Sequence, residues 1–259
     1  MSGLRIASWR LLYGAVIYLG ILYISGRRTS WRNIRIAVPA AVAIALEIAF
    51  FFVAIKLTTI ANVTIIGALQ PIILLGVASR QFGERISSGL VAASVVALAG
   101  VGIVAFGSAD QASWSVRGDL LALVATILFA AYFVYAKRAR EHVDAFEFQG
   151  ISMLIGAATL FPILLVDSGG SFEVPSPSDS VWLLVLLAVP GTGHLLMNWA
   201  HPKVRLSLTS MLTLAVPVLT TGGAVVFLGD SVNALQVVGM AVVLSALAIV
   251  VRNDIRAPA

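Results

Sequence analysis

Glu47 and His194 are ionisable residues inside long apolar stretches of the sequence. An ionisable side chain costs about 2.5–3.5 kcal/mol at the centre of a membrane-spanning helix, so each is a candidate for a functional role. Imidazole is the natural proton-sensitive partner of a carboxyl near neutral pH. The chain repeats at an offset of 146 residues, which aligns Glu47 with Gly193, next to His194. We therefore expect both to face one central cavity; the alternative is a structural polar contact between helices.

Polar and small residues form a stripe along the stretch that contains His194. The stripe comprises Gly191, His194, Asn198 and His201. Spacings of three and four residues place these side chains on one face of a helix. We expect Asn198 to line the cavity, Trp199 to offer a stacking or gating surface, and His201 to lie on the protein surface near the helix end. Pro190 would loosen the backbone before the stripe and act as a hinge. The alternatives are helix–helix hydrogen bonding for Asn198 and an interfacial position for Trp199.

Two further prolines, Pro71 and Pro217, correspond to each other at the same offset. Proline removes a backbone hydrogen bond and kinks a membrane helix, so we expect both to act as hinges or gates. The remaining candidates for a solute or proton pathway are polar residues that lie close to these prolines in the sequence or at the start of other helices. These are Asn62, Gln70, Ser210, Thr213, Arg10 and Gln149. For those near the prolines, the alternative is close packing and hydroxyl back-bonding.

The elements that must position these residues are membrane helices. The chain is 59% hydrophobic and 11% charged, against about 45–50% and about 25% in soluble domains. Apolar runs of roughly the 20 residues that cross a bilayer recur along the whole length, and in lipid they must be helical. The expected spans are 9–25, 35–56, 60–79, 87–107, 118–136, 147–166, 181–200, 206–228 and 233–251. The fold class is therefore an all-α polytopic membrane protein.

One sequence block occurs twice, over residues 65–104 and 211–250. With no gap, Gly83-Glu84 aligns with Gly229-Asp230. We expect these pairs to be structural, with the glycine ending one helix and the acid capping the start of the next.

Basic residues predict the orientation. All but four of the 17 Lys and Arg lie in one set of alternate loops, and the positive-inside rule places that set and the C-terminus in the cytoplasm. The four exceptions are Arg5, Arg10, Lys56 and Arg117. The two halves are then inverted repeats, residues 1–110 with four helices and residues 115–254 with five. The difference predicts that one helix is missing before residue 9.

The duplicated pattern resembles the drug/metabolite transporter superfamily, EamA type. The features that carry the resemblance are Trp9-Arg10-Leu11-Leu12, Pro71 followed by Gly83-Glu84-Arg85, and Pro217 followed by Gly229-Asp230. The resemblance implies ten helices in two inverted five-helix repeats and movement of small organic solutes, often outward. This chain departs from the pattern by lacking the first helix and by carrying Asp230 where the family usually has Glu.

The expected function is secondary transport of small organic metabolites or drugs across the cytoplasmic membrane by alternating access. We expect the protein to act as an exporter, and coupling of this export to proton movement is one of the mechanisms that the sequence allows. The alternatives are a non-transporting membrane partner or sensor, and an intramembrane enzyme. An enzyme is disfavoured because His194 has no Ser or acid beside it in its own helix, and the three His show no metal-ligand arrangement. We expect no cofactor or metal. The expected partners are a small-molecule substrate and the lipid bilayer, and we expect no binding to nucleic acid. The sequence does not decide between a monomer and a homodimer.

Overall fold

The computed structural model describes residues 1–107, 115–171, 173–229 and 231–256, and these ranges are helical with short connections and contain no strand. The helices are α1 (Gly3–Ile24), α2 (Trp31–Leu57), α3 (Ile60–Gly67), α4 (Gln70–Phe82), α5 (Ser88–Gly107), α6 (Val116–Arg140), α7 (Ala145–Asp167), α8 (Pro177–Ala200), α9 (Leu206–Leu212), α10 (Val216–Gly223) and α11 (Ala234–Arg256). A 3-10 turn (Thr213–Ala215) precedes α10, and a π-helical turn (Ala224–Leu228) follows it.

Nine helical segments within the described ranges are long and apolar enough to cross a membrane. Two of them are composite, because α3 joins α4 over Ile60–Phe82 and α9 joins α10 over Leu206–Phe227. The predicted all-α polytopic fold and its spans are therefore confirmed.

The chain forms two compact units. Unit 1 contains Met1–Phe52 and Ala131–Lys203, and unit 2 contains Val53–Ala130 and Val204–Ala259. Each unit therefore takes helices from both predicted repeats.

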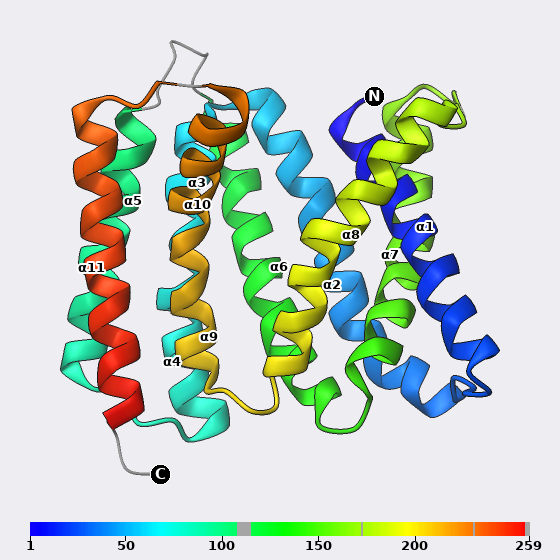
Figure 1. Ribbon diagram of the computed structural model, residues 1–259, viewed down its shortest axis with the longest axis horizontal. Coiled ribbons are helices and arrows are strands. Elements are labelled where there is room, and N and C mark those ends of the chain that lie inside the picture. The colour runs from blue at the N-terminus through cyan, green and yellow to red at the C-terminus, as the bar shows by residue number, and fades with distance from the viewer. Residues whose placement is uncertain (108–114, 172, 230, 257–259) are drawn as a thin grey trace. The chain divides into compact units, whose positions relative to one another are not determined.

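Small residues bring the helices of each unit close together. In unit 1, a Cβ added to Gly14 of α1 would overlap the side chain of Met153 in α7. In unit 2, α5 lies beside α11 (Figure 1), and a Cβ on Gly239 would stand 2.8 Å from the carbonyl oxygen of Gly100. Close backbone approach at small residues is how membrane helices gain packing energy.

The composite spans of unit 2 break at equivalent positions. The helix of α3 ends at Gly67, and α4 begins at Gln70; α9 ends at Leu212, and α10 begins at Val216. Pro71 and Pro217 therefore lie in the first turn of a new helical segment, where a missing N–H costs little. Each composite span ends at a left-handed glycine, Gly83 with φ 64° and Gly229 with φ 75°. The 146-residue repeat is thus visible in the backbone.

Glu84 caps a distant helix instead of the next one, which corrects the sequence expectation. Its carboxylate accepts hydrogen bonds from the backbone N–H of Leu206 at 2.6 Å and of Ser207 at 3.0 Å, and from the Ser207 hydroxyl at 2.5 Å. A carboxylate at a helix N-terminus satisfies free N–H groups and complements the helix dipole. The motif after α4 therefore holds the start of α9. Its counterpart Asp230 lies outside the described residues.

Replacing Glu84 with Ala is expected to destabilise the protein by about 2 kcal/mol, because charge-assisted hydrogen bonds to two amides and a hydroxyl are lost. Glu84→Gln should fall between wild type and Glu84→Ala. Thermal unfolding of the detergent-purified protein would measure the order, with exposed Glu141→Ala as the control. Equal stability of Glu84→Ala and Glu141→Ala would contradict the capping role.

Candidate functional site

A cavity of about 250 Å³ in unit 1 contains both Arg10 and Glu47. Its wall is formed by α1 and α2 and comprises Gly3, Ile6, Ala7, Arg10, Glu47, Ile48, Phe51 and Phe52. Spacings of three and four residues place Gly3, Ala7 and Arg10 on one face of α1. Gly3 and Ala7 are small and fill little of the space on that face. Two aromatic rings and two ionisable groups thus line one small cavity.

Neither Arg10 nor Glu47 forms a hydrogen bond or an ion pair with another side chain in the described ranges. A guanidinium stays charged under all ordinary conditions, and its five donors match carboxylate or phosphate acceptors. Charged groups in a membrane span usually face a partner or a water-filled cavity. Arg10 and Glu47 are therefore available to a bound solute or to water.

His194 lies half-buried on α8, also in unit 1. It is not among the residues that line the cavity, and within the described ranges it has no hydrogen bond. Arg10, and not His194, is therefore the ionisable residue that shares a cavity with Glu47. Sequence reasoning had listed Arg10 as a pathway candidate at a helix opening but had paired Glu47 with His194.

Asn198 and Gln149 belong to a buried network that joins α6, α7 and α8. The Asn198 amide nitrogen donates to Gln149 Oε1 at 2.6 Å, and its Oδ1 accepts from the Tyr132 hydroxyl at 2.9 Å. Arg140 Nε donates to the Asn198 carbonyl oxygen at 2.8 Å. Asn198 is 1% exposed, and it does not line either cavity described for unit 1. Sequence reasoning missed Tyr132, whose only signal is a hydroxyl within an apolar run.

His201 is completely buried just beyond the end of α8, so the prediction of a surface residue was wrong. Its ring packs edge-on against Phe133 with a centroid distance of 5.2 Å. Neither ring nitrogen has a hydrogen-bond partner in the described part of the chain. Burial, followed by the charges of Lys137 and Arg140, lowers the pKa of His201 to about 4. The imidazole is therefore neutral in the folded protein at pH 7.

Stability is expected to fall as the pH drops from about 6.5 towards 4, because the unfolded chain binds a proton at His201 before the folded chain does. The loss amounts to at most about 3 kcal/mol. Thermal unfolding at pH 7.5 and 5.0 would measure it. His201→Phe should flatten the pH dependence, whereas the exposed control His142→Asn should not. An unchanged slope in His201→Phe would contradict the assignment.

Trp199 is 53% exposed, and Lys203 Nζ lies 3.1 Å from the centre of its ring. This cation–π contact joins two residues one helical turn apart. Pro190 lies inside α8, which continues through it. Neither residue lines a cavity described in unit 1.

The candidates in unit 2 are engaged in hydrogen bonds. Asn62 Nδ2 lies 3.2 Å and 3.3 Å from the two carboxylate oxygens of Asp119, which also accepts from the Thr58 hydroxyl at 2.7 Å. This cluster ties the α2–α3 turn to the first turn of α6, and sequence reasoning had not singled out Asp119.

At the break between α9 and α10, the Thr213 hydroxyl lies 3.1 Å from Gln70 Oε1 and 2.6 Å from the Ser210 carbonyl oxygen. Ser210 is fully buried, and its hydroxyl donates to the Ser207 carbonyl oxygen at 2.9 Å. The Gln70 amide nitrogen is buried and has no hydrogen-bond partner in the described ranges. The two broken helices thus meet through polar side chains.

The sequence profile of the EamA-like transporter family matches residues 1–106 and 116–252. An "Uncharacterized transporter" of Archaeoglobus fulgidus is 23% identical over an alignment of 265 positions, gaps included, that covers 98% of this chain and 90% of that protein. "Glucose uptake protein GlcU" of Staphylococcus xylosus is 25% identical over an alignment of 163 positions that covers 61% of this chain and 53% of that protein. A solved crystal structure shares the fold with a TM-score of 0.81 at 18% identity, covering 99% of this chain and 89% of its own. The chain therefore belongs to the EamA-like transporter family and is a multi-pass membrane transporter.

Proposed function

We propose that this transporter is a secondary exporter that moves small organic solutes across the cytoplasmic membrane by alternating access, in exchange for protons. The observation that supports this proposal is the cavity lined by Arg10 and Glu47, neither of which has a hydrogen bond or ion pair to another side chain in the described part of the chain. A basic and an acidic group within membrane spans, lining one cavity with Phe51 and Phe52, suit a polar organic solute with an apolar part.

In this proposal Glu47 is the proton-carrying group. A carboxyl can hold a proton in one conformation and release it in another when its hydration or the charge of its neighbours changes. Arg10 is the permanent charge in the same cavity, and His194 is a second titratable group, on α8 of the same unit. The rival interpretation is that Glu47 only binds a cationic group of the solute.

A binding screen with purified protein tests the site. The panel contains amino acids, nucleosides, amines and, because one relative is named as a glucose uptake protein, glucose. At least one solute should raise the unfolding temperature of wild type and of Arg80→Gln, an exposed arginine outside the cavity, but not that of Arg10→Gln. A solute that stabilises Arg10→Gln and Glu47→Gln as well as wild type would place the site elsewhere. Solutes that bind are then tested for movement in proteoliposomes.

The proposed orientation predicts that residue 30 faces the cytoplasm and residue 171 faces outward. The sequence has no cysteine, so Ser30→Cys and Ser171→Cys each carry a single label site. An impermeant thiol reagent applied to whole cells should label Ser171→Cys, and Ser30→Cys should react only after permeabilisation. The reverse pattern would overturn the proposed orientation.

A further inference from the structure

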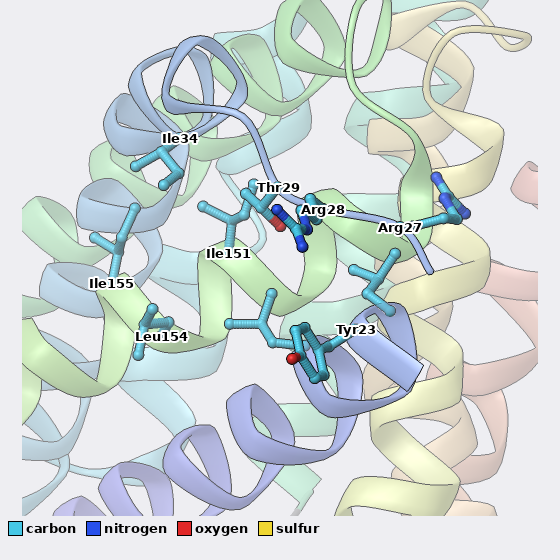
Figure 2. A pocket seen from close by; sticks show the side chains of 10 residues that line it. Tyr23, Arg27, Arg28, Thr29, Ile34, Ile151, Leu154 and Ile155 are labelled. Carbon is cyan, nitrogen blue, oxygen red and sulfur yellow. The ribbon is translucent and has the colours of Figure 1, made fainter. Parts of the chain in front are cut away.

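A second cavity in unit 1, of about 270 Å³, lies where α1 ends and α2 begins, against α7. Figure 2 shows the side chains that line it. Its polar members are Tyr23, Arg27, Arg28 and Thr29 from the end of α1 and the following loop. Its apolar members on α7 are Ile151, Leu154 and Ile155. The cavity shares no residue with the one that contains Arg10 and Glu47.

The position of this cavity matches the boundary of a bilayer. The spans on either side of the loop are Gly3–Ile24 and Trp31–Leu57, so Arg27, Arg28 and Thr29 lie beyond the apolar segments. Leu154 and Ile155 lie inside the span Ala145–Asp167. The cavity therefore has a polar rim at headgroup depth and an apolar wall at hydrocarbon depth.

The charged side chains that line this cavity are all positive. Its lining contains two arginines and no acid. Arg28 has no ion pair or hydrogen bond to another side chain in the described ranges, and Figure 2 shows it next to Thr29 and turned away from Arg27. Arg27 Nη2 lies 3.4 Å from Asp144 Oδ1, in a pair whose side chains are about half exposed. Exposed pairs of this kind contribute little, so a stronger anion can compete for Arg27.

Asp144 stays ionised in that pair. Burial raises the pKa of its carboxyl, but hydrogen bonds from the Glu147 and Phe146 amides and the charges of Arg27 and Arg140 outweigh burial and hold the pKa below its ordinary value. The carboxylate is therefore a local competitor for any anion that approaches Arg27.

We propose that this cavity binds an anionic phospholipid, with the phosphate at Arg28 and the Thr29 hydroxyl, Arg27 as a second positive charge at the rim, and an acyl chain along Leu154 and Ile155. Basic pockets between membrane helices recognise anionic headgroups in this way. A soluble phosphate ester would use the arginines but would leave the apolar wall without a partner. The proposal does not depend on the transported solute.

The test is native mass spectrometry of the detergent-purified protein, titrated with phosphatidylglycerol or phosphatidylcholine of equal chain length. Wild type should retain phosphatidylglycerol preferentially. Arg28→Gln should weaken its binding about fivefold and the Arg27→Gln/Arg28→Gln double variant about 25-fold, since each basic residue near a headgroup contributes about that factor. Arg80→Gln is the matched control and should bind as wild type does. Equal binding of the two lipids, or no loss in the double variant, would overturn the proposal.

Two further variants separate the parts of the site. Asp144→Asn keeps an N-cap for α7 but removes the charge that holds Arg27, so it should bind phosphatidylglycerol more tightly than wild type. Leu154→Ser should weaken lipid binding without affecting inorganic phosphate. Glycerol 3-phosphate should not displace the lipid at equal concentration. If it does, the site is one for soluble phosphate esters, and the lipid assignment is wrong.

Discussion

Glu47→Gln is expected to abolish solute accumulation driven by a pH gradient in proteoliposomes while solute exchange continues. With one proton exchanged per solute, a gradient of one pH unit can drive about tenfold accumulation, because each proton then carries about 1.4 kcal/mol. Glutamine preserves the shape and most of the hydrogen bonding of Glu47 but cannot ionise. The expected ratio of the solute concentrations on the two sides of the membrane is therefore about one for Glu47→Gln, against up to about ten for wild type.

Exchange is the internal control of this experiment, because it needs a folded protein and a solute site but no net proton movement. Glu141→Gln, an exposed acid outside the spans, is the matched variant and should accumulate solute as wild type does. A full response of Glu47→Gln to the pH gradient would show that Glu47 is not the coupling site. Poor folding of Glu47→Gln that is rescued by His194→Gln would assign the two residues a structural role.

The fold could be predicted largely from the sequence, since its physical causes are local. Apolar runs of bilayer length must be helical, and the structure has the nine expected spans within its described ranges. The 146-residue offset also anticipated the matching ends at Gly83 and Gly229. The breaks at residues 68–69 and 213–215 were not predicted, because proline was expected to kink the middle of a span and it opens a new segment instead.

The candidate site could be predicted only in part. The position of Glu47 in the middle of a membrane span identified it as a candidate. The 146-residue offset shows which residues are equivalent in the two repeats, but it does not show which residues lie close together in space. It therefore favoured His194 over Arg10 as the residue that shares a cavity with Glu47. The structure lines one cavity with Arg10 and Glu47 and leaves His194 off that wall. Spacing along a helix likewise could not show that Glu84 reaches Leu206, 122 residues away, or that His201 is buried against Phe133.

Asn198→Leu is the second replacement with a large expected effect. Leucine fills a similar volume but removes the donor to Gln149 and the acceptor for Tyr132, two buried hydrogen bonds that join three helices. Single interhelical hydrogen bonds in membranes contribute about 0.6 kcal/mol and at most about 1.7 kcal/mol. A loss of about 1–3 kcal/mol is therefore expected. Thr192→Val on the same helix is the control, because the hydrogen bond that its exposed hydroxyl forms in the described structure is to its own helix, at the Ala188 carbonyl oxygen.

A double-mutant cycle shows whether these residues act as a network. Gln149→Leu alone should lower the free energy of unfolding by less than Asn198→Leu does, because it breaks only one of the two side-chain hydrogen bonds described for Asn198. The double variant should be destabilised by less than the sum of the two single changes, with a coupling energy of about 0.5–1.5 kcal/mol. Arg140 donates to the backbone of residue 198, so this bond is retained in every variant. Additive losses would contradict the network. An Asn198→Leu protein that is stable but inactive in solute exchange would place Asn198 in the transport pathway.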